Sequence, residues 1–291
     1  MLGVPAFADE EQTRASGPVK TNLDEYMAVP RGPHALPGPF PGRVVQVSHE
    51  GCLAEDEVQP EAVAEMLEAG VRKLTGKSLK QSFAIFFTPE DVVGLKVNPV
   101  GPPLINTRHE LVEAVIRWLV DGGLPKGNIV IWDRFEGMLS EGGYTAERYP
   151  GVRIEALQMM DASGDGWRDE KGRHLSEERF DREAVYLAEG VLGKGVAGYK
   201  DDEFYLNQHV FAGEHSYFGK LVTRELTKIV NLPVFKNTGN GISMATKNLG
   251  YAAICNTGRL HRPLFFRVCT EVLAAPWIRD KLVLNITDGI R

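Results

Sequence analysis

The chain has few cysteines, and no two of them have the spacing of a metal-binding or redox motif. Its three cysteines, Cys52, Cys255 and Cys269, form no CxxC pair, so no iron–sulfur ligand set is encoded. We expect three buried free thiols. The alternative, for an exported protein, is one disulfide and one free thiol.

Long apolar runs, a basic excess and several common enzyme motifs are absent as well. No stretch is long and apolar enough for a transmembrane helix. The formal net charge of −6 argues against wholesale binding to nucleic acid. There is no GxSxG elbow, Walker loop or complete GxGxxG fingerprint. What remains is an ordinary globular composition, with enough residues to bury a full core.

The pattern of the first 42 residues predicts the remnant of a signal peptide followed by a proline-rich leader. Ala6-Phe7-Ala8 resembles the cleavage region of a secretory signal, although the charged and apolar regions that normally precede it are missing. Five prolines between residues 29 and 42 favour an extended segment outside the core. We therefore predict an exported or periplasmic protein, with a chance match as the alternative. Residues 43–291 form the predicted single domain, and its end straight after a strand predicts a missing C-terminal piece.

Strand and helix patterns alternate along this domain. Short apolar runs indicate buried strands, and apolar residues at helical spacing indicate amphipathic helices. The predicted strands lie at 43–47, 92–98, 128–132, 152–157, 207–211, 229–230 and 281–288. The predicted helices lie at 60–74, 79–86, 108–120, near 137, at 217–224, around Lys247-Asn248 and at 264–274. This order predicts an α/β fold with a mainly parallel sheet flanked by helices.

Polar side chains stand at the ends of four predicted strands. In chain order they are Lys96 and Asn98, Asp133 and Arg134, Lys236 and Asn237, and Asp288. Ligands of open parallel sheets bind beyond the carboxyl ends of the strands. Lysines placed there supply positive charge for a phosphate or carboxylate or, when desolvated, an amine for base or Schiff-base chemistry. The two aspartates can hold a divalent cation or neutralise the lysines, and the alternative to any site is a set of solvated strand ends.

The stretch from residue 228 to residue 251 is the strongest candidate for a site. A strand is followed there by Lys236, by a polar turn containing Gly239 and Gly241, and by a helix with Lys247 and Asn248. Backbone N–H groups and lysines converge on an anionic group in this kind of arrangement.

Two further features carry weaker signals. His261 follows a Gly-Arg-Leu segment, where a histidine is more often a capping or surface residue than a ligand. The loop at 161–172 has calcium-like spacing, but Gly172 stands where a bidentate glutamate is needed, which favours a hairpin or surface loop.

These residues resemble a known family. The matching segments are VVGLKVN at 92–98, NLPVFK at 231–236, ATKNLG at 245–250, His261, and ITDG at 286–289. They are similar to the V-x-I-K-x-N, N-L-P-x-x-K-T-H, A-L-K-N-L-x-G and I-x-D-x-I segments and the histidine of the domain of unknown function 362 family. The resemblance covers roughly residues 43–291. The chain departs from that family at Asn237-Thr238, where Thr-His is common.

The resemblance implies a location more than a reaction, because the family is named for lacking an assigned one. Its members are often exported through twin-arginine signals. Many also carry ferredoxin-like cysteine motifs, which this chain lacks.

The sequence therefore predicts an enzyme-like protein that binds a small anionic ligand at the carboxyl ends of its strands. The catalytic candidates are Lys96, Lys236 and Asp288, the ligand-binding candidates are Asn98, Lys247, Asn248 and His261, and the candidate ligand of a divalent metal is Asp133. The alternative is a non-catalytic ligand-binding or redox-associated accessory module.

Overall fold

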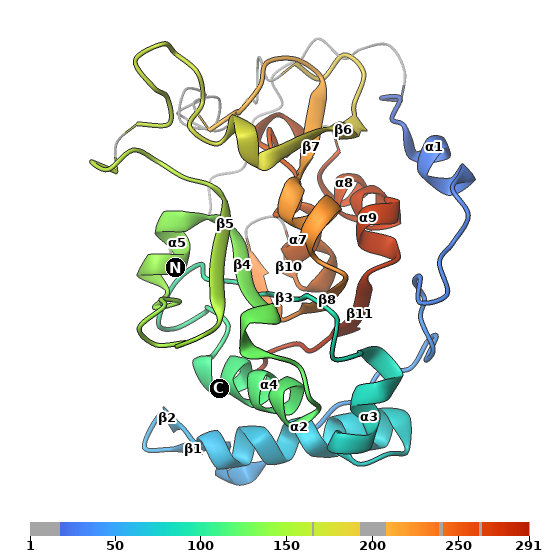
Figure 1. The fold of residues 1–291 in the computed structure, drawn as a ribbon, viewed down its shortest axis with the longest axis vertical. Helices are drawn as coiled ribbons and strands as arrows, with labels where there is room; N and C mark the ends of the chain where they lie inside the picture. The colour runs from blue at the N-terminus through green and yellow to red at the C-terminus, as the bar shows by residue number, and fades with distance from the viewer. Residues whose placement is uncertain (1–17, 165, 193–207, 239–240, 262–263, 291) are drawn as a thin grey trace, which may run out of the picture.

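A five-stranded parallel sheet forms the centre of the molecule (Figure 1). The computed structural model describes residues 18–164, 166–192, 208–238, 241–261 and 264–290. The strand order is β11-β8-β3-β4-β5, and every neighbouring pair is parallel. These strands are β3 (Val93–Lys96), β4 (Ile129–Phe135), β5 (Arg153–Gln158), β8 (Lys228–Asn231) and β11 (Leu282–Asn285). The predicted α/β fold with a parallel sheet flanked by helices is confirmed.

The order of the strands creates a reversal point beside β3. The chain builds β4 and β5 on one side of β3 and then crosses to the other side for β8 and β11. Lys96 at the end of β3 is level with Trp132 on β4 and with Asn231 on β8. In open parallel sheets the ligand crevice lies at the carboxyl edge where the strand order reverses. Here that position is between β3 and β8.

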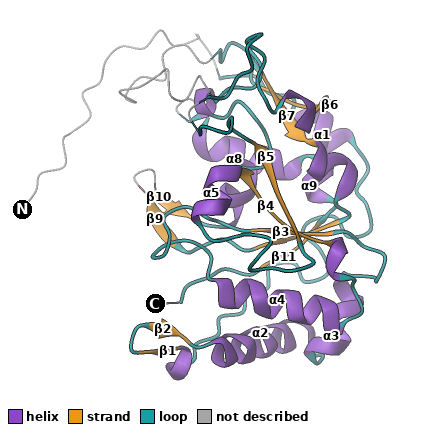
Figure 2. Ribbon diagram, turned by 60° about the vertical axis from the view of Figure 1, so that its left-hand side comes forward, coloured by secondary structure: helices purple, strands orange, loops and turns teal. Residues whose placement is uncertain are grey.

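Three helices cover one face of the sheet (Figure 2). They are α2 (Pro60–Thr75), α3 (Leu79–Phe86) and α4 (His109–Asp121). Pro60 occupies the first turn of α2, and Ser78 forms a capping box with Gln81 at the start of α3. Their apolar stripes pack with Leu95 and Ile131 in one buried cluster. The structure confirms all three predicted helices, because local periodicity and caps specify them.

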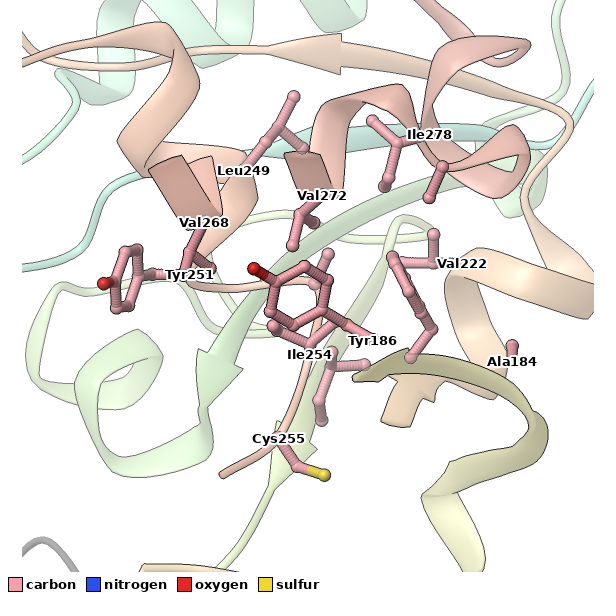
Figure 3. Packing of buried hydrophobic residues seen from close by; sticks show 14 of the residues in the cluster. Ala184, Tyr186, Val222, Leu249, Tyr251, Ile254, Cys255, Val268, Val272 and Ile278 are labelled. Atoms are coloured by element: carbon pink, nitrogen blue, oxygen red, sulfur yellow. The ribbon is translucent and has the colours of Figure 1, made fainter. Parts of the chain in front are cut away.

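The other face carries a mixed layer. It contains α7 (Ala245–Gly250), α8 (Phe265–Ala274), α9 (Pro276–Arg279) and an antiparallel pair, β6 (Phe180–Leu187) and β7 (His215–Gly219). Tyr186, Leu249 and Val272 meet in its core (Figure 3). Helices α7 and α8 approach so closely that a Cβ on Gly250 would lie 2.7 Å from the Cα of Cys269.

Short elements complete the described part of the chain. They are α1 (Leu23–Ala28), α5 (Glu136–Glu141), the pairs β1 (Leu53–Ala54) with β2 (Glu57–Val58) and β9 (Lys236–Thr238) with β10 (Gly241–Ser243), the 3-10 turns η1 (Glu50–Cys52), η2 (Lys126–Asn128), η3 (Glu177–Arg179) and η5 (Gly258–Leu260), and the π turn η4 (Leu221–Glu225). None of the helices in the described ranges has the length and apolarity needed to cross a bilayer.

The N-terminal region differs from the predicted leader. The motif at 6–8 lies outside the described residues, but the segment from residue 18 onward packs on the domain. Tyr26 is 3% exposed, and its ring lies 6.0 Å from that of Trp277. The predicted strand at 43–47 is not formed. The segment contacts α2 instead, where Arg43 donates to the Leu74 carbonyl at 3.3 Å and Val47 lies beside Gly70.

The region between β5 and β8 also departs from the prediction. A helix was predicted at 217–224, yet residues up to 219 belong to β7, because pairing with β6 outweighs local preference, and only the π turn η4 at Leu221–Glu225 is helical. The predicted strand at 207–211 begins outside the described residues, and 208–211 form no strand. In the loop at 161–172, Asp169 accepts hydrogen bonds from Arg173, and an isolated antiparallel bridge joins Arg168 to His174. This geometry fits the favoured hairpin or surface loop.

Candidate functional site

Lys96 is buried at the carboxyl end of β3 and forms an ion pair with Asp133 at the end of β4. Its side chain is 1% exposed. Its ammonium also donates to the Val97 carbonyl at 2.5 Å and to Asn248 Oδ1 at 3.2 Å. Burial lowers the pKa of Lys96, whereas the carboxylate of Asp133 opposes that shift. Asp133 is therefore the counter-ion of a buried lysine.

Asn248 on α7 connects three strands at the reversal point. Its Nδ2 donates to Asn231 Oδ1 at 2.8 Å and to the Lys96 carbonyl at 3.3 Å. Its Oδ1 accepts from Lys96 and from Asn98 Nδ2 at 3.3 Å. Asn231 in turn donates to Asn285 Oδ1 on β11 at 2.8 Å. The amide of Asn248 thus fixes the lysine and the strand ends relative to one another.

Lys236 approaches the same network from β9. Its ammonium donates to Asn98 Oδ1 at 2.9 Å and to the carbonyls of Ile105 at 3.0 Å and Val100 at 3.3 Å. All three acceptors are neutral oxygens. The side chain is half-buried, and no carboxylate in the described ranges forms an ion pair with it.

Lys247 on α7 adds a third positive charge. Its ammonium lies 5.4 Å from the centre of the Phe265 ring, and burial lowers its pKa. Burial, followed by the charges of Lys247 and Lys96, lowers the pKa of Lys236 to about 8. Three lysines thus share one ion-paired carboxylate, that of Asp133, among the described residues.

We call Lys96, Asn98, Asp133, Lys236, Lys247 and Asn248 the lysine cluster. The structure brings together these six residues, which the sequence had assigned to several strand ends and one helix. Asn231 belongs to the same network, although the sequence indicated only that it ends a strand.

Asp288 lies apart from the lysine cluster in its contacts. Its Oδ2 accepts from the backbone N–H of Arg108 at 2.7 Å, and its Oδ1 accepts from that of Ile290 at 3.0 Å. Burial raises its pKa. Both oxygens are thus used at the start of α4, which indicates a positioning role more than a part in catalysis.

His261 is packed between aromatic rings. Its ring centre lies 4.7 Å from that of Tyr251 and 5.8 Å from that of Phe265. Its Nδ1 donates to the Thr257 carbonyl at 2.9 Å, since a carbonyl oxygen can only accept. Burial lowers its pKa to about 4, so the ring is neutral at neutral pH.

The candidate metal ligand, Asp133, has no cluster of further metal ligands around it in the described ranges. The described ranges contain no group of three or more His, Cys, Asp or Glu side chains arranged to hold one. Asp133 is engaged by Lys96. The three cysteines, Cys52, Cys255 and Cys269, are free thiols as predicted, although Cys52 is only half-buried.

The glycine-containing turn does not lead directly into a helix. Lys236 belongs to the β9–β10 hairpin, and Lys247 belongs to the short helix that follows it. Residues 239 and 240 lie outside the described ranges. The two lysines therefore meet through the hairpin and α7, not around one turn.

Comparison with known proteins leaves the family open. No protein-family model and no curated protein matches the chain. Among solved structures, the chain is similar to a structural-genomics target from Thermotoga maritima, with 9% identity and a TM-score of 0.36. The match covers 82% of this chain and 54% of that one, so the chain spans about half the length of that structure. Similarity at this level carries no functional assignment.

Proposed function

We propose that the lysine cluster binds a small anionic ligand, a carboxylate or a phosphate, at the carboxyl edge of the sheet between β3 and β8. The observation that carries this proposal is the environment of Lys236. Among the described residues, its ammonium has only neutral oxygens as hydrogen-bond partners, while Lys96 and Lys247 add like charge nearby.

The charge of the cluster supports an anion over a cation or a neutral ligand. Asp133 neutralises Lys96, which leaves Lys236 and Lys247 without a carboxylate partner in the described part of the chain. Like charges in a half-buried site repel one another, and a bound anion relieves that repulsion. The position between β3 and β8 is also where open parallel sheets bind their ligands.

The two kinds of lysine suggest an enzyme over a passive binding module. Lys96 is ion-paired with Asp133, whereas Lys236, with a pKa of about 8, supplies a fraction of neutral amine near neutral pH. A neutral amine can act as a base or attack a carbonyl. The alternative is a non-catalytic module in which the same residues hold the anion without turnover.

The resemblance to the domain of unknown function 362 family involves the same residues. Lys96, Lys236 and the Lys247-Asn248 pair come from three segments that resemble family motifs. Hydrogen bonds connect Lys96, Asn248, Asn98 and Lys236, and the charge of Lys247 acts on Lys236. Membership and an exported location stay predictions.

Binding of inorganic phosphate and acetate, measured by isothermal titration calorimetry, tests the proposal. Replacing Lys236 by methionine should weaken binding roughly 10- to 100-fold, the effect of losing a hydrogen bond from a charged donor. Lys281→Met is the matched control. Lys281 donates to two carbonyls, at 2.6 and 3.2 Å, and burial lowers its pKa to about 8, but it precedes β11 at the opposite edge of the sheet. Equal affinities in the two variants would refute the anion site.

Trapping with borohydride separates the enzyme from the binding module. An amine that attacks a keto acid forms an imine with loss of water, and borohydride reduces that imine to a stable adduct. Mass spectrometry should locate the adduct on Lys236. Anion binding without any adduct would favour the binding module.

A further inference from the structure

Two arginines on the mixed side of the sheet are buried and form no ion pair with a carboxylate of the described residues. Arg134, which follows Asp133 on β4, is 7% exposed, and Arg259 on η5 is 1% exposed. Arg134 donates to Gln158 Oε1 at 2.6 Å and to the Thr257 hydroxyl. Arg259 donates to a backbone carbonyl at 2.7 Å and to Ser216 Oγ at 2.8 Å. Every one of these acceptors is neutral.

Other arginines of the same layer form ion pairs with carboxylates. Arg279, 2% exposed, forms an ion pair with Asp280 at 2.9 Å, and Arg267 forms one with Glu271 at 2.6 Å. A buried guanidinium normally has such a partner, because an uncompensated buried charge is strongly unfavourable. Within the described ranges, Arg134 and Arg259 form no ion pair.

Buried side-chain nitrogens without a hydrogen-bond partner lie near the two arginines. The buried Nε of Arg259, Nε2 of His209 and Nε2 of His174 have no hydrogen-bond partner. In His174, Nδ1 accepts from the Ser176 N–H at 3.0 Å, so the proton of the neutral ring is on Nε2. Native folds rarely leave such groups unpaired, and water, an ion or a ligand usually completes them.

One turn holds Arg134, Arg259 and His209 in the same neighbourhood. Asn256 Oδ1 accepts from the backbone N–H of the residue after His209 at 2.8 Å, which fixes His209 beside the turn. Thr257, the next residue, binds the guanidinium of Arg134, and Arg259 follows two positions later. Burial and the neighbouring arginine charges lower the pKa of His209 to about 3, so its ring stays neutral.

We propose that Arg134, Arg259 and His209, which we call the arginine cluster, form a second anion site that takes one oxyanion group, a carboxylate or a phosphoryl group. Guanidinium groups match the paired oxygens of these anions in geometry as well as in charge. A bound oxyanion would pair with guanidinium groups that form no ion pair among the described residues, and it would supply an acceptor for the unpaired N–H of Arg259. This inference goes beyond the lysine cluster and holds whether or not that cluster binds a ligand.

The number of bound anions tests the proposal with the full-length chain. Inorganic phosphate and acetate are titrated separately by calorimetry. Wild-type protein should bind two equivalents of at least one of them, Lys236→Met one, and Arg259→Met one. The double variant should bind none. These stoichiometries show separately whether the arginine cluster binds an anion and whether the lysine cluster does.

Arg279→Met is the matched control for removing a buried arginine, and circular dichroism checks that each variant folds. Its stoichiometry should equal that of the wild type. If Arg259→Met does not fold, His209→Phe replaces it, and we expect it to weaken the Lys236-independent site about 3- to 10-fold through loss of a neutral hydrogen bond. Binding that vanishes entirely in Lys236→Met, or that is unchanged in both arginine-cluster variants, would overturn the inference. So would a wild-type protein that binds neither anion.

Discussion

The lysine cluster and the arginine cluster lie at the same edge of one sheet but balance their charge in opposite ways. The lysine cluster contains its own carboxylate, since Asp133 pairs with Lys96. The arginine cluster has only neutral acceptors in the described part of the chain. Asp133 pairs with Lys96, whereas the following residue, Arg134, donates to Gln158 and Thr257. Two neighbouring residues of β4 therefore belong to different clusters: Asp133 to the one that contains a carboxylate, and Arg134 to the one that has neutral acceptors in the described part of the chain.

The two clusters also differ in whether their positive groups lose a proton near neutral pH. Lysine pKa values respond strongly to burial, and that of Lys236 is lowered to about 8. Burial lowers the pKa values of Arg134 and Arg259 to about 10, which still leaves both charged at neutral pH. The lysine cluster can therefore change its charge near neutral pH, whereas the arginine cluster is a fixed positive receptor.

Removing the internal counter-ion should have the largest effect. Asp133→Ala leaves the Lys96 ammonium buried without its partner, which should lower the free energy of unfolding by about 3–5 kcal/mol in urea denaturation. A double variant, Lys96→Met with Asp133→Leu, removes both charges and should recover most of that loss. If Asp133→Ala lowers the free energy of unfolding by less than about 1 kcal/mol, the Lys96 side chain does not need this carboxylate to stay buried.

Breaking the amide network should have a smaller effect. Asn248→Ala leaves Asn231 Oδ1 and one donor hydrogen of Asn98 without their partner, at a cost of about 1–3 kcal/mol in the free energy of unfolding. Asn285→Ala is the control, because Asn285 is exposed and accepts one bond from the same network. If the two variants lose equal stability, Asn248 has no special role in holding the lysine cluster.

The pH dependence of anion binding should show the smallest effect, and it distinguishes the lysine cluster from the arginine cluster. In Arg259→Met, where only the lysine cluster binds, affinity for phosphate should fall as pH rises above about 8, by at most about tenfold per pH unit. The sign follows because Lys236 binds the anion when protonated and loses its charge above its pKa. In Lys236→Met, where only the arginine cluster binds, affinity should stay nearly constant between about pH 7.5 and 9 because both arginines remain charged.

The same profile has two internal checks. Lys236→Arg should restore binding above pH 8 in the lysine cluster, because a guanidinium keeps its charge. A fall of equal steepness in Lys236→Met would contradict the distinction between a titrating and a fixed site.

The sequence alone determined the elements whose signals are local. Apolar spacing and end signals placed α2, α3 and α4 within a few residues, and the apolar run ending in Lys96 placed β3. Polar strand ends pointed to Lys96, Asp133 and Lys236 because the parallel topology sends all carboxyl ends to one edge. These signals lie within short windows, and no distant partner is needed to read them.

Only the tertiary structure decided which polar groups meet. Lys96 and Asn248 are 152 residues apart in the chain, and Arg134 and Thr257 are 123 apart. Asp288 reaches the start of α4 across 180 residues, so its role depends on where β11 joins the sheet. Strand order and loop path fix these encounters, and a sequence window contains neither. The arginine cluster was therefore invisible in the sequence, where His209 and Arg259 stand in segments with no shared pattern.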